Sequence, residues 1–240
     1  MGKVIMSGIV PQLTKPLAGI LASDIAVGST VKLMENGNPV EYLVVHKGLP
    51  SSAYDSSCDG VWVLRKDVLA LAKWHGSLSD YEGSDANKYL ENTFLPQLDL
   101  SVLSAIKQVK IPYRPGNGIS TTVYTGSSGL TAKSFLLSHT EVGCTTDSAP
   151  VIGAKLDYFL SGNTDSQSAT RRIAYLNGTA VYWWTRSPYS HADNPQGVIC
   201  IGDSGYRYGV STNNVYGIRP ALILPSSALF DAKTLVLKGA

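Results

Sequence analysis

Two short segments near the C-terminal end carry most of the information about the fold: Val181-Tyr-Trp-Trp-Thr-Arg-Ser-Pro188 and Tyr216-Gly-Ile-Arg-Pro-Ala-Leu222. Adjacent side chains on a strand point to opposite faces, so we expect Trp183 or Trp184 to lie in the core. Arg186 and Arg219 each stand beside a proline-containing turn. A guanidinium group has five donors and can bond loop carbonyls that no sheet satisfies. We therefore predict a structural role for all four side chains, with direct ligand contact as the alternative.

The residues between these two segments are rich in Tyr, Ser, Asn, Asp and Gly, a composition typical of antibody-like binding surfaces. Tyrosine offers a large contact area at low entropic cost, while Asn and Asp suit the hydroxyl groups of a sugar. An ordinary set of polar surface loops is the alternative. If the surface binds a ligand, we expect one exposed face to hold the candidate residues: Tyr189, His191, Asp193, Asn194, Tyr206, Arg207, Tyr208, Asn213, Asn214 and Tyr216.

Working outward, the rest of the chain divides into an early part with helices and a later part with short strands. The Asn36-Gly37 pair predicts a hairpin turn between strands 29–34 and 40–46, and a further strand is expected at 61–64. Helices are expected over 67–74, after Ser84 as N-cap, and over 100–106. Beyond Pro112, short apolar strands alternate with polar loops, at 134–137, 173–176, 180–185, 198–201 and 218–224. This mixture predicts an α+β fold.

Composition narrows the possible functions of the 240-residue chain, which is 44% hydrophobic and 16% charged, with a net charge of +2. The scattered basic residues give no electrostatic case for binding nucleic acid. No apolar run approaches the length of a membrane span, and no signal peptide is evident. The spacing of the histidines suggests no metal site, and we expect no cofactor. The cysteines Cys58, Cys144 and Cys200 leave two possibilities open, one disulfide with a spare thiol or, our preference, three reduced thiols.

Four segments together resemble a family of uncharacterised domains that is common in Firmicutes and in their prophages and gut phages. They are Phe135-Leu-Leu-Ser138, Arg172-Ile-Ala-Tyr-Leu-Asn-Gly178, Trp183-Trp-Thr-Arg-Ser-Pro188 and Tyr216-Gly-Ile-Arg-Pro-Ala-Leu222. That family looks like a branch of the C-type lectin-like fold, related to formylglycine-generating enzymes and to phage receptor-binding proteins diversified by retroelements. The resemblance implies short twisted antiparallel strands with peripheral helices and long polar loops. We expect an attachment or oligomerisation leader at 1–27, the lectin-like domain at 28–225 and a C-terminal extension at 226–240.

The resemblance implies a phage or prophage tail-associated protein, made in the bacterial cytoplasm and located in the virion, that contacts a glycan or protein on the host surface. A homo-oligomer, preferably a trimer, and other virion proteins are the expected partners. A structural decoration or fibre protein without a receptor is one alternative. An enzyme of the formylglycine-generating kind is another, but those relatives use a pair of cysteines near the C-terminus, and only Cys200 lies there. We therefore expect no enzymatic activity.

Overall fold

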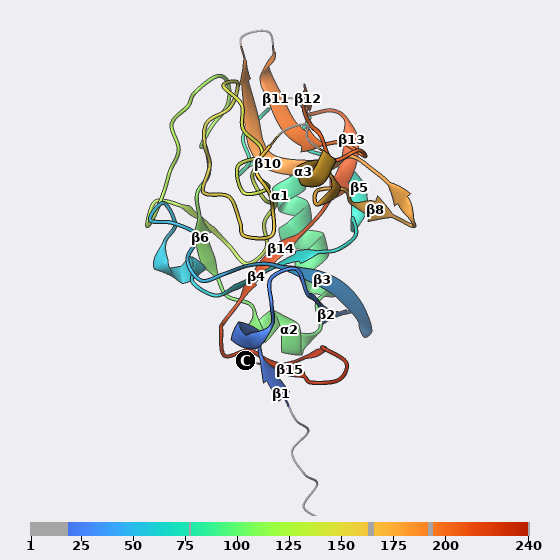
Figure 1. The fold of residues 1–240 in the computed structure, drawn as a ribbon. Helices are drawn as coiled ribbons and strands as arrows, with labels where there is room; N and C mark the ends of the chain where they lie inside the picture. Colours follow the sequence, from blue (N-terminus) through green and yellow to red (C-terminus); the bar gives the residue numbers. More distant parts are fainter. Residues whose placement is uncertain (1–18, 77, 163–165, 192–193, 240) are drawn as a thin grey trace, which may run out of the picture.

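A four-stranded antiparallel sheet, in the order β14-β4-β3-β2, occupies the middle of the molecule (Figure 1). The computed structural model describes residues 19–76, 78–162, 166–191 and 194–239. Strands β2 (Thr30–Glu35) and β3 (Asn38–Lys47) form the predicted hairpin. Asn36 and Gly37 connect them with φ angles of 48° and 75°, the two positive values that a tight hairpin turn requires. The hairpin prediction is therefore confirmed.

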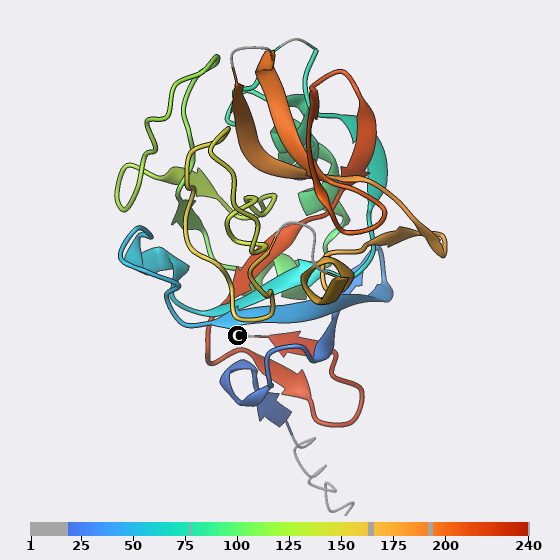
Figure 2. The same ribbon diagram turned by 45° about the horizontal axis from the view of Figure 1, so that its top comes forward.

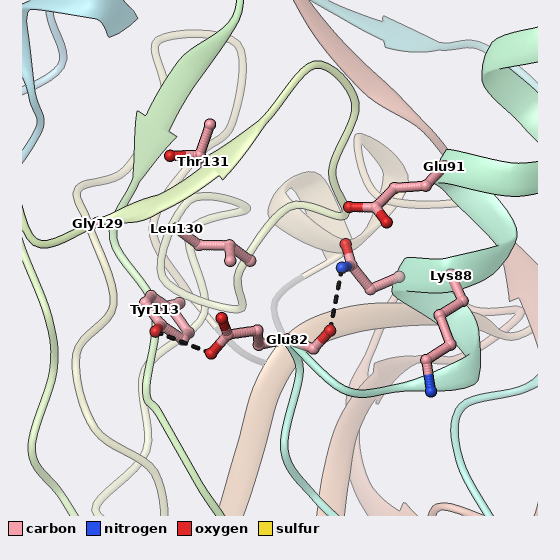
Figure 3. A pocket seen from close by; sticks show the side chains of 8 residues that line it. Glu82, Lys88, Glu91, Tyr113, Gly129, Leu130 and Thr131 are labelled. Carbon is pink, nitrogen blue, oxygen red and sulfur yellow. Dashed lines mark hydrogen bonds between the residues drawn. The ribbon is translucent and has the colours of Figure 1, made fainter.

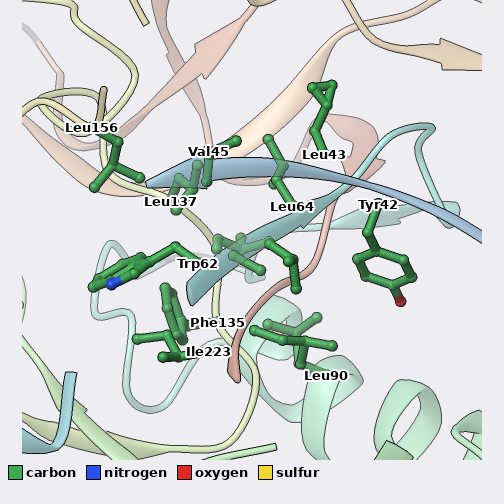
Figure 4. Close-up of a cluster of buried hydrophobic side chains, with 14 of the residues drawn as sticks. Tyr42, Leu43, Val45, Trp62, Leu64, Leu90, Phe135, Leu137, Leu156 and Ile223 are labelled. Carbon is green, nitrogen blue, oxygen red and sulfur yellow. The ribbon is translucent and has the colours of Figure 1, made fainter. Parts of the chain in front are cut away.

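The core lies against both faces of this sheet. Successive residues of β4 (Val61–Arg65) and β14 (Ala221–Leu224) are buried regardless of the face they point to, which explains their unbroken apolar sequences. Figure 4 shows Trp62, Leu64 and Phe135 within the buried cluster around these strands. The Trp62 ring meets the Phe135 ring edge to face, with 5.5 Å between ring centroids, an arrangement that aromatic pairs prefer.

A five-stranded sheet, in the order β12-β11-β10-β13-β5, forms the other large layer (Figures 1 and 2). Its strands are β5 (Ala70–Lys73), β10 (Trp183–His191), β11 (Asn194–Ile201), β12 (Arg207–Ser211) and β13 (Val215–Ile218). All neighbours are antiparallel except β10 and β13, which pair in parallel through Trp183 and Gly217. After β13, Arg219 and Pro220 lead the chain into β14, so this one step joins the two large sheets.

The two ends of the described chain meet in a three-stranded sheet. Strand β1 (Gly19–Leu21) pairs with β15 (Leu229–Asp231), which pairs in turn with β16 (Leu237–Gly239). Figure 1 shows this sheet below the central one. Two further pairs of short strands are β6 (Val109–Ile111) with β7 (Leu130–Ala132), and β8 (Tyr175–Leu176) with β9 (Thr179–Ala180). The described parts of the expected leader and of the expected extension are thus hydrogen-bonded to each other.

Helices are few and short. The described residues contain α1 (Asp85–Tyr89), α2 (Leu100–Ala105) and α3 (Ser166–Thr170), with a π-helical turn at Leu90–Phe94 and 3-10 turns at Ala22–Asp24, Ser56–Cys58 and Leu95–Gln97. Ser84 caps α1, because its Oγ accepts a hydrogen bond from the Asn87 amide at 3.0 Å. The helix predicted over 67–74 is wrong, since Ala70–Lys73 pair with β13 as a strand.

The predicted α+β, C-type lectin-like fold is wrong as well. The described residues are mostly β, with 37% of them in strands and 14% in helices, and their strands are divided among five small sheets. Two of the three expected helices exist. The first runs from α1 through the π-helical and 3-10 turns to Gln97, and α2 has only six residues, so they do not form a helical layer. Strand pairing across distant parts of the sequence outweighs the local helical spacing of the apolar residues here.

Candidate functional site

Four aromatic side chains form a continuous row on one face of the five-stranded sheet. Tyr182 stacks on Tyr216, with 5.0 Å between ring centroids and 27° between ring planes. The Tyr208 ring lies 5.6 Å from Tyr182 on one side, and the Trp184 ring lies 4.8 Å from Tyr216 on the other. We call Trp184, Tyr216, Tyr182 and Tyr208 the aromatic row. Trp184 is buried, Tyr182 and Tyr216 are half-buried, and Tyr208 is 38% exposed.

The aromatic row is fixed by a hydrogen bond to strand β5 and by close packing against Gly202. Trp184 donates its indole N–H to the Ala72 carbonyl at 2.9 Å, which fixes the innermost ring to strand β5. Gly202 follows β11 and leaves room for two of the rings. A Cβ there would lie 2.6 Å from the Tyr208 ring and 3.2 Å from the Tyr182 ring. Any larger residue at 202 would therefore push these rings aside.

The hydroxyl groups of Tyr182 and Tyr216 are neutral hydrogen-bonding groups. Burial, assisted by the nearby Asp203 carboxylate, raises the pKa of Tyr182. Burial likewise raises the pKa of Tyr216, whose hydroxyl oxygen accepts a hydrogen bond from Asn214 Nδ2 at 3.2 Å. A neutral phenol both donates and accepts, so the row combines apolar ring surface with polar groups at its edge.

Strand alternation separates the predicted ligand-binding residues into two sets. Tyr208 and Tyr216 belong to the aromatic row. Arg207 precedes Tyr208 on β12 and points to the opposite face, where its Nε donates to the Thr145 carbonyl at 3.0 Å. The Tyr189 ring covers Gly209, whose added Cβ would lie 2.8 Å from it, so Tyr189 is also on that opposite face. The strand register therefore places the predicted ligand-binding residues on two opposite faces of the sheet, and not on the single face expected from the sequence.

The other predicted residues lie at the ends of the same strands. Tyr206 precedes β12, and its carbonyl accepts the Gly202 amide at 2.7 Å. Asn213 is exposed and Asn214 half-buried, both in the turn between β12 and β13. His191 and Asn194 form the last backbone pair of the β10–β11 hairpin. Asp193 lies outside the described residues. The sequence analysis missed Tyr182, although its place two residues before Trp184 put both on the same face.

Arg186 lies at the centre of a buried polar network. Its guanidinium makes a two-pronged ion pair with Glu141, and both side chains are fully buried. It also donates to the carbonyls of Pro112 and Leu136, at 3.0 and 2.8 Å. Burial alone would lower the pKa of Arg186, but the Glu141 carboxylate outweighs burial and raises that pKa. Arg186 thus connects β10 to three other segments of the chain.

Trp183 and Arg219 form a second buried contact. The Arg219 guanidinium lies over the Trp183 ring, 5.0 Å from its centroid, and donates to the carbonyls of Arg65 and Lys66. Burial lowers the pKa of Arg219 to about 10, a value that leaves the group charged at neutral pH. The Trp183 indole donates to the Arg172 carbonyl at 2.9 Å. Neither side chain reaches the surface, which fits a structural role better than ligand contact.

The three cysteines and the His139–Ser187 pair belong to the interior of the protein. All three cysteines are free and buried. Burial raises the pKa of Cys58 and of Cys200 to about 12 each, so both remain as thiols. His139 Nδ1 lies 2.9 Å from Ser187 Oγ, but both residues are buried, and burial lowers the pKa of His139 to about 4. Within the described ranges, no three His, Cys, Asp or Glu side chains gather as a metal site.

A separate cavity of about 440 Å³ lies beside α1 and β7 (Figure 3). Figure 3 shows the Glu82 side chain directed toward Tyr113 and Leu130, with Glu91 on the helix at the opposite side. The Tyr113 hydroxyl donates to Glu82 Oε2 at 3.1 Å. Burial, followed by the negative charge of Glu82, raises the pKa of Tyr113 to about 12. Nothing in the sequence drew attention to this cavity, because its lining comes from three distant segments.

Comparison with known proteins identifies the family to which the chain belongs. The family described as a domain of unknown function, DUF6273, matches residues 59–226, which is more than half of the chain. The chain is a member of the DUF6273 family. No curated protein and no solved structure matches it. No helix among the described residues is long and apolar enough to span a bilayer.

The DUF6273 match covers most of the structure but not all of its central sheet. It includes β4 and β14 and every strand of the five-stranded sheet. It begins after β2 and β3, the hairpin that completes the four-stranded sheet through the pairing of β3 with β4. The aromatic row and the cavity both fall inside the matched residues. The comparison therefore supports membership of an uncharacterised family, which is the coarser part of the resemblance noted from the sequence. It supports neither a lectin-like fold nor a phage or Firmicutes source.

Proposed function

We propose that this DUF6273 protein is a non-enzymatic binding module and that the aromatic row is its contact surface. The observation that carries the proposal is the contact of four rings across three strands, with Tyr208 at the exposed end. Aromatic side chains with a wet polar end and a packed apolar body are enriched at binding surfaces. The preorganised rings lose little side-chain entropy when a ligand binds.

We propose a surface glycan as the ligand. The apolar C–H face of a sugar ring packs against an aromatic ring, and its hydroxyl groups exchange hydrogen bonds with the phenols and with Asn214. The low charge of the chain favours contact complementarity over long-range electrostatic attraction. Single-site affinity is then weak, and several copies acting together would multiply it by about 10²–10⁴.

The setting that we propose is a phage or prophage tail, where several copies contact a bacterial host surface. A homotrimer is the oligomer that we propose, by analogy with phage fibres. Light scattering on the full chain and on a chain lacking residues 1–18 tests the oligomer, since this deletion leaves β1 and its pairing with β15 intact. If the full chain and the shortened chain both had the mass of a monomer, the proposed oligomer would be refuted.

The binding proposal is tested with immobilised bacterial surface polysaccharides as probes. Tyr182 and Tyr208 are changed together to Ala, and binding is measured by surface plasmon resonance. The expected result is a loss of at least about tenfold in affinity, because central aromatic residues contribute about 2 kcal/mol or more to binding. Thermal unfolding of the same variant checks that it remains folded.

Tyr175→Ala provides the matched control, since Tyr175 is 43% exposed but lies on β8, outside the aromatic row. This variant should bind the polysaccharides as the wild type does. Equal losses in the control and in the double variant would show that exposed tyrosines contribute without a defined site. Unchanged binding by the folded double variant would show that the aromatic row is not the contact surface.

A further inference from the structure

The cavity beside α1 has a lining that is rich in hydrogen-bond acceptors and contains one cationic side chain, that of Lys88. It holds about 440 Å³, within the range of small-molecule sites, and none of its residues belongs to the aromatic row. Tyr113 and Leu130 are almost fully buried and supply apolar surface. Glu82 and Glu91 supply two carboxylates, and both residues are exposed.

A buried acceptor without a partner lines the same cavity. Asn87 is only 4% exposed, and its Nδ2 donates to the Glu82 carbonyl at 3.2 Å. Its Oδ1 is buried and accepts no hydrogen bond from any described residue. A buried carbonyl oxygen without a donor is costly, so a donor brought by a ligand would be strongly favoured there.

The lining of the cavity holds two carboxylates and one ammonium group, so its net charge is negative. Neither Glu82 nor Glu91 forms an ion pair with a described residue. Lys88 also lines the cavity, but Figure 3 shows its ammonium group directed away from Glu91 and Tyr113. Glu82 keeps one oxygen free, because Tyr113 bonds only Oε2. The two carboxylates and the amide oxygen are therefore acceptors that suit a cation with several donors.

We propose that this cavity binds a small organic molecule through a primary ammonium group. An ammonium has three donors and no acceptor, which suits a lining that offers the carboxylates of Glu82 and Glu91 and the unpartnered Asn87 Oδ1. The carbon body of the ligand would pack on Tyr113 and Leu130. A divalent metal fits less well, because calcium takes six to eight oxygens and magnesium keeps an octahedral shell. This site is independent of the aromatic row and of the function proposed for it.

Glucosamine and glucose form a matched pair of probes, because glucose carries a neutral hydroxyl group where glucosamine carries its ammonium. Both are titrated into the ¹⁵N-labelled full chain, and the Asn87 side-chain amide signal is followed by NMR. Glucosamine should shift this signal and glucose should not. The glucosamine Kd should rise with salt, since the attraction is between charges.

The decisive variant is Glu91→Gln, which removes one charge at an exposed position and keeps the shape of the side chain. We expect it to weaken glucosamine binding by about tenfold, as the loss of a charge-assisted hydrogen bond does. Glu41→Gln is the control, because Glu41 is also an exposed glutamate but pairs with Lys66 elsewhere. The Tyr182→Ala, Tyr208→Ala double variant should leave the glucosamine-induced shift of the Asn87 signal unchanged.

Several results would overturn the proposal. Equal shifts with glucose would make the cavity a neutral sugar site, and equal or tighter binding of Ca²⁺ would make it a metal site. An Asn87 signal that neither probe moves would show that the unpartnered oxygen meets no ligand of this class. Unchanged affinity in Glu91→Gln would remove the charge on which the ammonium assignment depends.

Discussion

Replacing Arg186 by Met should destabilise the protein more than any other loss of an ion pair among the described residues. The substitution removes a fully buried cation and leaves the equally buried Glu141 carboxylate without a counter-charge. Breaking a buried pair on one side costs about 3–5 kcal/mol. The carbonyls of Pro112 and Leu136 also lose their donor, and each unsatisfied buried acceptor costs about 1–3 kcal/mol. We expect a loss of at least about 4 kcal/mol.

The measurement is urea unfolding, followed by the fluorescence of the four tryptophans. The loss is a large part of a typical unfolding free energy of about 5–15 kcal/mol, so Arg186→Lys provides a milder variant that keeps the charge. Lysine cannot make the two-pronged contact, so this variant should also be less stable than the wild type. Lys66→Met is the matched control, since Lys66 and Glu41 form an ion pair in which each side chain is 47% exposed.

The exposed control pair should contribute no more than about 1 kcal/mol to stability. The double variant Arg186→Met, Glu141→Leu should recover part of the stability that Arg186→Met loses, because it removes the uncompensated charge. If Arg186→Met unfolded at the same urea concentration as Lys66→Met, the buried network would not have the energetic weight assigned to it here.

Three further predictions concern other parts of the same architecture. Trp184→Ala should cost about 3–5 kcal/mol in thermal or urea unfolding, because it empties the fully buried end of the aromatic row; no loss of stability would contradict its core position. Gly202→Ala should move the Tyr182 and Tyr208 rings and alter their NMR ring-current shifts, and unaltered shifts would mean that the contact is not tight. Burial lowers the pKa of His139 to about 4 in the folded protein, so the unfolded chain binds a proton at this residue more tightly than the folded protein does. The free energy of unfolding should therefore fall as the pH drops from about 6.5 to 4, by up to about 3 kcal/mol. A His139→Asn variant should lose less over that range in pH-dependent melting, and an equal loss would refute the assignment.

The parts of the fold that follow from local rules were predictable from the sequence. Asn36-Gly37 between two apolar runs specified the β2–β3 hairpin, because both residues tolerate positive φ. Ser84 marked the start of α1 for a similar reason, since its hydroxyl satisfies a free backbone amide. The segment 67–74 misled because its apolar spacing suits a helix, whereas its strand conformation depends on pairing with β13, more than 140 residues away.

The candidate surface was predictable only in part. The density of tyrosines drew attention to Tyr208 and Tyr216, which the structure places in the aromatic row. The choice of a single face ignored the alternation of Arg207, Tyr208 and Gly209 along one strand. Tyr182 was overlooked because it precedes two tryptophans, in an apolar segment whose pattern predicts a buried strand. The cavity beside α1 had no local signal at all, since Glu82, Tyr113 and Thr131 meet only in the folded chain.

Two of the four segments that carry the sequence resemblance, 183–188 and 216–222, supply the arginines of the framework rather than the candidate contact surface. Arg186 joins β10 to the segments around Pro112, Leu136 and Glu141, while Arg219 fixes the step from the five-stranded to the four-stranded sheet. Both guanidinium groups are buried, so their removal affects stability before it affects any ligand. Strands β11 and β12 lie between the two motifs in the sequence, and β12 is an edge strand with one neighbour. An edge strand can change its outward side chains without disturbing a second partner. If the proposed function holds, we expect ligand preference to vary at β12 while the buried arginines keep the two large sheets together.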